Sequence, residues 1–161
     1  MKKTLLPLLS FMMTAGAFFA PADAYASSHE KTVGIGGGFA TYNHAGFGKL
    51  YFQYSFIPMV RIAPEIGYIF RHDNTTGFAA SIDCHFPFRV ARGFKFYPLV
   101  GFTYNAWSPV DEPHVNQGGV NIGGGFDLYF TQSLKLSIQG KYSAMRKCSG
   151  AYFDLGIGYV F

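Results

Sequence analysis

Ser81, Asp83 and His85 bring the three residue types of a hydrolytic charge relay into one short stretch of chain. A serine nucleophile needs an imidazole within hydrogen-bond reach and a third group that orients the imidazole. A spacing of two puts all three side chains on one face of a β-strand, where neighbours lie roughly 7 Å apart. That distance is too long for a direct Ser–His hydrogen bond. The spacing therefore favours a structural role for Asp83 and His85 over catalysis.

Other residues with ligand or phosphate-binding chemistry are scattered. The remaining histidines lie in the amino-terminal tail or in separate connections, with no partner two or four residues away: His29, His44, His72 and His114. The glycine clusters at 34–38 and 123–125 lack the following Lys-Ser/Thr of a phosphate loop, so they are interpreted as glycines within strands. We expect neither a metal site nor a cofactor.

Cys84 and Cys148 are the two cysteines, and a disulfide is the simplest interpretation for an exported chain. The strand pattern described below argues against it. Cys84 falls on the outward face of one strand and Cys148 in a connection on the opposite side of an eight-stranded ring. We therefore expect two free thiols.

The elements that position these residues are β-strands, and the clearest is the last, 151–161. Its odd-numbered residues from Ala151 to Phe161 are apolar, whereas its even-numbered residues are mostly polar or small. This period of two places every large apolar side chain on one face. In an outer-membrane β-barrel that face meets lipid, and aromatic residues at the strand end lie at the membrane interface.

The same alternation recurs along the chain and predicts eight strands, at 32–42, 47–56, 60–70, 77–88, 94–106, 119–130, 134–144 and 151–161. Segments of about 10 residues suffice to cross a bilayer as tilted strands, and small outer-membrane barrels have an even number of them, from eight upward. Backbone polar groups in hydrocarbon must all be paired, so the sheet must close. We predict an all-β fold, an eight-stranded antiparallel up-and-down transmembrane β-barrel. A bulge is expected at Pro64 and at Pro98, which fall within strands.

The lengths of the connections support this assignment. With both termini in the periplasm, the connections 57–59, 89–93 and 131–133 become periplasmic turns. The outward-facing set is longer, and 107–118 is its longest member. This agrees with the short turns and long external loops of bacterial barrels.

Residues 1–26 have the features of a secretory signal peptide. Lys2 and Lys3 precede an apolar stretch, and Ala-x-Ala sites end at Ala24 and Ala26. The apolar stretch is short and contains Pro7, which disfavours the alternative of a membrane anchor. We predict cleavage after Ala26, a barrel domain at 27–161 and localisation in the bacterial outer membrane.

Charge is sparse and scattered. Removal of Lys2, Lys3 and Asp23 from the 13 basic and 9 acidic residues leaves 11 and 8. No basic run remains, so nucleic acid is not an expected partner.

The inward-facing positions of the predicted strands carry most of this charge, which is expected to form an internal network: Lys49, Arg61, Glu65, Asp83, His85, Lys95, Asp127, Lys135, Lys141 and Asp154. Buried charges are tolerated when they are paired, and an eight-stranded barrel is just wide enough for side chains to fill. We therefore expect a plugged interior, with a narrow ion-conducting path as the alternative. Near the outer strand ends, Tyr104, Trp107 and Tyr142 are predicted to form an aromatic girdle.

Residues 123–142, GGGFDLYFTQSLKLSIQGKY, resemble the penultimate hairpin of small opacity-type and OmpX-like outer-membrane barrels. The resemblance covers 119–161 in motif and the whole mature chain in architecture. It implies that Tyr159 and Phe161 form the carboxy-terminal signal read by the outer-membrane insertion machinery. It also implies a structural, adhesive or host-contact role, and the short outer loops weaken the adhesive one.

Together these patterns favour a non-enzymatic barrel that contributes to envelope structure or surface interaction. Outer-membrane lipid or lipopolysaccharide and the insertion machinery are the expected partners, and a monomer is the expected state. A small porin-like channel is the first alternative. A lipid-A-modifying enzyme is less favoured, because it needs a nucleophile facing lipid near the outer rim.

Overall fold

The computed structural model describes residues 29–42, 44–72, 74–109, 114–146 and 148–161. Residues 1–26, with the predicted signal and cleavage site, lie outside these ranges. The described residues form nine strands: β1 Lys31–Ala40, β2 Ala45–Ile57, β3 Val60–His72, β4 Thr75–His85, β5 Phe88–Ala91, β6 Phe94–Pro109, β7 Val115–Tyr129, β8 Leu134–Ala144 and β9 Gly150–Val160. No helix within these ranges is long and apolar enough to span a membrane.

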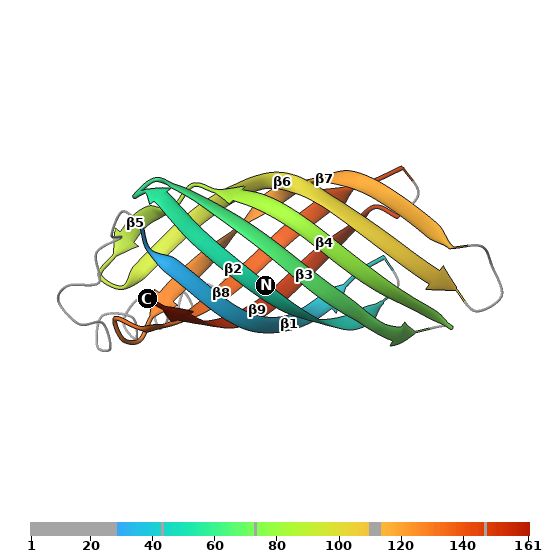
Figure 1. The fold of residues 1–161 in the computed structure, drawn as a ribbon, viewed down its shortest axis with the longest axis horizontal. Helices are drawn as coiled ribbons and strands as arrows, with labels where there is room; N and C mark the ends of the chain where they lie inside the picture. Colours follow the sequence, from blue (N-terminus) through green and yellow to red (C-terminus); the bar gives the residue numbers. More distant parts are fainter. Residues whose placement is uncertain (1–28, 43, 73, 110–113, 147) are drawn as a thin grey trace, which may run out of the picture.

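The strands form one closed antiparallel sheet. Strands that follow one another in the chain pair with each other, except that β4 and β5 both pair with β6, and β1 also pairs with β9. The strands run obliquely around the long axis (Figure 1). The two ends of the barrel chain meet where the Phe161 amide donates to the Lys31 carbonyl at 2.9 Å. We call this end of the barrel, which holds β5 and the carboxy terminus, the terminal end, and the other the loop end.

β4 and β5 are two parts of one long strand. His85 lies opposite Leu99 of β6, and Phe88 lies opposite Phe96, so both segments keep the same register against β6. The break falls at Phe86 and Pro87, where proline has no N–H to donate. With β4 and β5 counted together, the ring has eight strands. The predicted fold class is confirmed.

Alternation sorts side chains between the two faces of the sheet. On β9 and at the following Phe161, the odd-numbered residues from Phe153 onward are all more than half exposed, whereas Tyr152 and Asp154 are buried. The pattern holds around the ring, and Phe102 of β6 reaches 73% exposure on the outer face. The barrel is thus apolar outside and polar inside.

The bulges expected at Pro64 and Pro98 are absent. Pro64 keeps its register opposite Ile82, and Pro98 keeps its register opposite Gly124. The missing N–H groups are accommodated without an inserted residue. At Pro98, the carbonyl accepts a hydrogen bond from the Phe86 amide at 3.0 Å, beside the break in the β4–β5 strand.

The predicted loop 107–118 is mostly strand. β6 continues to Pro109 and β7 begins at Val115, with Trp107 paired opposite Val115. Beyond the end of β8, β6 and β7 still pair with each other, so their backbone N–H and C=O groups remain hydrogen-bonded. A β-hairpin therefore extends from the loop end, and its tip lies outside the described residues.

Candidate functional site

The barrel interior holds the charged residues that the sequence pattern placed on inward faces. All ten predicted residues point inside, and nine of them are buried. Glu65 is the tenth, and its side chain is 14% exposed. The structure distributes these residues over contacts that run along the barrel axis.

Glu30 is a further charged interior residue, and it lies before the first predicted strand. It precedes β1, and its carboxylate accepts hydrogen bonds from the Tyr129 hydroxyl at 2.8 Å, Lys95 Nζ at 3.2 Å and Lys135 Nζ at 3.3 Å. With Glu30, five inward-facing carboxylates face five cationic side chains in the described interior. The alternation of β1 extended back from Thr32 would have identified Glu30 as inward-facing.

The environment of Glu30 changes its acidity. Burial raises the pKa of this carboxyl group, but the positive charges of Lys135 and Lys95 and the hydrogen bond from Tyr129 outweigh burial. The net pKa lies below its ordinary value, because these partners stabilise the ionised form.

Arg61 connects several strands next to the group formed by Glu30, Lys95, Tyr129 and Lys135. Its guanidinium group donates to Asp127 Oδ2 on β7 at 2.5 Å and to His85 Nδ1 on β4 at 3.0 Å. Arginine has no acceptor, so Nδ1 must accept and the His85 proton lies on Nε2. The same guanidinium lies 4.7 Å from the centre of the Tyr97 ring, a cation–π contact.

A second charged group lies toward the loop end. Lys49 contacts Asp154 at 2.8 Å and Glu65 at 3.0 Å. Lys141 contacts Asp83 at 2.8 Å and also contacts Glu65. Glu65 therefore bridges two lysines from strands on different sides of the ring.

Ser81, Asp83 and His85 do not form a charge relay. The Ser81 hydroxyl donates to Thr103 Oγ1 at 3.0 Å, and Asp83 accepts from Asn121 at 2.7 Å. His85 is bound by Arg61 and stacks on the Tyr97 ring at 4.5 Å between centroids. The three side chains have separate partners inside the barrel, away from its outer surface.

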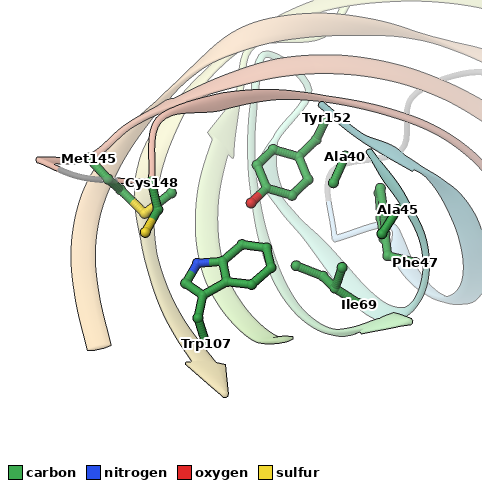
Figure 2. Packing of buried hydrophobic residues seen from close by; sticks show 8 residues of the cluster. All are labelled: Ala40, Ala45, Phe47, Ile69, Trp107, Met145, Cys148 and Tyr152. Atoms are coloured by element: carbon green, nitrogen blue, oxygen red, sulfur yellow. The ribbon is translucent and has the colours of Figure 1, made fainter. Parts of the chain in front are cut away.

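An apolar cluster closes the loop end (Figure 2). Its members are buried and come from five strands and the β8–β9 connection: Ala40, Ala45, Phe47, Ile69, Trp107, Met145, Cys148 and Tyr152. The prediction that Trp107 belongs to an external girdle is wrong, since this residue is only 2% exposed. By parity it shares the inward face of β6 with Asn105. Tyr104 and Tyr142 are exposed, as a girdle requires.

Both cysteines are free. Cys148 is buried in the apolar cluster, whereas Cys84 is half-buried on the outer side of β4. Among the described residues, no group of three or more histidine, cysteine, aspartate or glutamate side chains is placed to hold a metal ion.

The interior is densely filled. Two small cavities in the barrel interior are both lined by Lys49 and Glu65. Their volumes are about 20 and 10 Å³. A cavity needs roughly 10–15 Å³ to hold one water molecule. Each of these two spaces therefore has room for about one water.

Tyr51 accounts for part of this filling. Its ring lies against Gly34 of β1 and Gly156 and Gly158 of β9, where an added Cβ would overlap the ring. Glycines here let a large aromatic side chain lie flat on the inner wall. Aromatic residues laid over strand glycines also help to hold the register in β-proteins.

Tyr159 and Phe161, the predicted insertion signal, lie on the outer face at the terminal end. Both are more than half exposed, and their rings stack with centroids 6.3 Å apart. Neither contributes to the interior network.

A closed ring of eight antiparallel strands, apolar outside and charged inside, is the architecture of small outer-membrane β-barrels. Several solved structures that resemble this chain are of that kind. The amino-terminal β-barrel domain of OprF from Pseudomonas aeruginosa aligns with a TM-score of 0.73 at 19% identity, over 83% of this chain and 98% of that one. The attachment invasion locus protein Ail of Yersinia pestis aligns with a TM-score of 0.64 at 16% identity, over 84% of this chain and 100% of that one.

Neisserial surface protein A aligns with a TM-score of 0.66 at 12% identity, over 84% of this chain and 98% of that one. At these identities the likeness concerns the fold. No protein-family model matches the chain. No curated protein matches it in sequence.

Proposed function

We propose that this protein is an integral, non-enzymatic β-barrel of the bacterial outer membrane, with a plugged polar interior, contributing to envelope structure or surface interaction. The observation that carries the proposal is the outer surface, on which large apolar side chains from every long strand are exposed. In water such a surface would be strongly unfavourable, whereas in a bilayer it replaces lipid–lipid contact. Ring closure also pairs the backbone groups that hydrocarbon cannot solvate.

Export and insertion follow from two segments. Residues 1–26 act as the signal peptide, and Tyr159 and Phe161 form the address for the outer-membrane insertion machinery. The exposed position of both aromatic residues beside the chain terminus suits such recognition. Outer-membrane lipid or lipopolysaccharide is the surrounding partner. The protein acts as a monomer, without nucleic acid or cofactor.

The gel mobility of unheated and boiled samples tests the barrel. A folded barrel resists dodecyl sulfate at room temperature, so the two samples should migrate differently, and circular dichroism should show β-structure. Equal mobility together with a helical spectrum would contradict the proposal.

The plugged interior is supported by the charge pairs across the ring and by cavities with room for about one water each. The rival is a small porin-like channel. Planar-bilayer recordings distinguish the two: we expect no steady conductance, and a stable open channel would overturn the plug.

A lipid-A-modifying activity is the remaining alternative. It has little support, because Ser81 and His85 are buried inside and occupied by Thr103 and Arg61. Mass spectrometry of lipid A from a deletion strain and wild type should give identical spectra. A missing or added acyl or headgroup modification would restore the enzyme hypothesis.

A further inference from the structure

Some polar atoms in the barrel interior have no partner in the protein. Among the described residues, eight buried side-chain nitrogen or oxygen atoms make no hydrogen bond. Four of them are Gln53 Oε1, His85 Nε2, Gln139 Nε2 and Asp154 Oδ2, on residues that are at most 5% exposed. A buried polar atom without a hydrogen bond costs free energy, so each of these atoms calls for a partner.

The residues that carry these four atoms line one cavity. It is the smaller of the two interior cavities, with a volume of about 10 Å³. Tyr51 lines it as well, and its hydroxyl is a fifth unpartnered atom. The wall draws on β2, β3, β4, β8 and β9, so the cavity lies between strands from different parts of the ring.

The larger cavity provides a comparison. Its volume is about 20 Å³, and none of the described residues lining it carries an unpartnered buried atom. Ser81 in its wall donates to Thr103 at 3.0 Å, and Asn105 donates to the Tyr152 hydroxyl at 2.8 Å. The smaller cavity is therefore distinguished by unmet hydrogen bonds and not by its size.

Two of the unpartnered atoms are donors. His85 Nδ1 accepts from Arg61 at 3.0 Å, so the ring proton lies on Nε2, which can only donate. Gln139 Oε1 accepts from the Tyr97 hydroxyl at 3.3 Å, which leaves the amide nitrogen of the same side chain as a free donor.

The other two are acceptors. Asp154 Oδ1 lies 2.8 Å from Lys49 Nζ, and Asp154 Oδ2 remains available. Gln53 Oε1 is the second acceptor. One water molecule accepts two hydrogen bonds and donates two, so it matches this set. A metal cation does not, because two of the four atoms carry N–H groups.

We propose that one water molecule is bound in this cavity, accepting from His85 and Gln139 and donating to Gln53 and Asp154. The volume suits a single water, and a buried water needs two to four polar partners. His85 is held by Arg61, whereas Asp154 is held by Lys49, so the water joins the two charged groups into one network. The proposal deepens the plugged interior proposed above and rests on it.

The test is nuclear Overhauser spectroscopy of the isotope-labelled, full mature barrel in detergent micelles, which detects long-lived water beside individual protons. The His85 Nε2–H proton and the Gln139 amide protons should each give a cross-peak to water, with the sign of a molecule that tumbles with the protein. Ala63 also lines the cavity, so Ala63→Val fills it and should remove both cross-peaks. Ala79→Val is the matched control: it fills the larger cavity and should leave both cross-peaks in place.

Gln53→Leu/Gln139→Leu is a second variant, for use if Ala63→Val does not fold. The water would keep only two of its four partners, and leucine methyl groups would replace the two amide groups. The cross-peak from His85 to water should therefore be lost.

A folded wild-type barrel, identified by its mobility difference on heating, that lacks these cross-peaks would overturn the water site and leave the plug standing. Cross-peaks that persist at wild-type intensity in the folded cavity variants would also overturn the site. A steady conductance in planar bilayers would contradict the plug itself and, with it, a single trapped water.

Discussion

Arg61 and Asp127 are 66 residues apart in the chain, yet the arginine Nη1 and the aspartate Oδ2 lie 2.5 Å apart across the barrel interior. They belong to β3 and β7, which do not pair with each other. This ion pair therefore connects strands that the backbone ladder leaves separate. Both side chains are at most 2% exposed.

Removing one member of this pair should destabilise the barrel more than removing both. Asp127→Leu leaves the buried Arg61 without its ion-pair partner, whereas Arg61→Met leaves Asp127 with the Ser137 hydrogen bond and a 3.9 Å contact to Lys135. Loss of one member of a buried ion pair typically costs about 3–5 kcal/mol of unfolding free energy, and the larger loss is expected for Asp127→Leu. The double variant removes both charges and should recover most of that loss. Guanidinium unfolding in detergent micelles or vesicles measures the coupling.

The exposed Arg71→Gln serves as the control and should be near neutral. If the stability losses of the two single variants simply add up in the double variant, Arg61 and Asp127 do not stabilise the barrel through each other.

Glu30→Gln should weaken the terminal end and change its response to acid. The pKa of Glu30 is lowered in the folded state, so ionised Glu30 stabilises the fold fully above its unfolded-state pKa of about 4.5. That contribution is lost as the pH falls through the lower folded-state pKa. Glu30→Gln should cost about 3 kcal/mol at neutral pH and reduce the loss of stability on acidification.

Lys31→Gln is the matched control, because the adjacent side chain points outward. Unfolding midpoints measured from neutral pH to below pH 4.5 provide the comparison. An unchanged acid response in Glu30→Gln would assign that response to other carboxylates.

Gly34→Ala should destabilise the barrel by about 1–3 kcal/mol, as overpacking does. An added Cβ at this position overlaps the Tyr51 ring. Shortening the neighbour in Gly34→Ala/Tyr51→Leu should relieve part of the strain. Gly118→Ala is the control, since a Cβ there meets its nearest atom at 3.9 Å. Equal effects at Gly34 and Gly118 would point to a general glycine effect on strands.

Cys84 and Cys148 should react with maleimide at very different rates. Cys84 is half-buried on the outer side, so a membrane-permeant maleimide should label it in the folded barrel. Cys148 is packed in the apolar cluster and should react only after unfolding. Mass spectrometry after labelling counts the modified sites in wild type, Cys84→Ser and Cys148→Ser. Rapid labelling of Cys148 in the folded protein would contradict the packing at the loop end.

Side-chain direction was predictable because it depends only on alternation. Alternation places Lys49 and Asp154 inside, and both are buried there. The partners of these residues were not predictable. Lys141 reaches Asp83 and Glu65 because strand tilt and register bring β8, β4 and β3 to the same level, and neither quantity is encoded in a single strand.

Errors arose where a residue type was given more weight than its position. Trp107 was assigned to the outer girdle because it is aromatic, although its parity with Asn105 places it inside. Glu30 lies before the predicted strand 32–42, so alternation within that strand does not reach it. The extent of β7 was underestimated because Val115 to Gly119 contain polar and glycine residues, yet this segment pairs with β6.

Trp107 is the one tryptophan of the chain, and it lies in the cluster where several strands and the β8–β9 connection meet. The protein thus has a built-in fluorophore at a single location. Its emission reports whether the loop end has become dry and packed, and it is insensitive to the terminal end, where Glu30 and Arg61 lie. Tryptophan fluorescence and a spectroscopic label near Glu30 would therefore measure separately how fast the loop end and the terminal end fold as the barrel assembles.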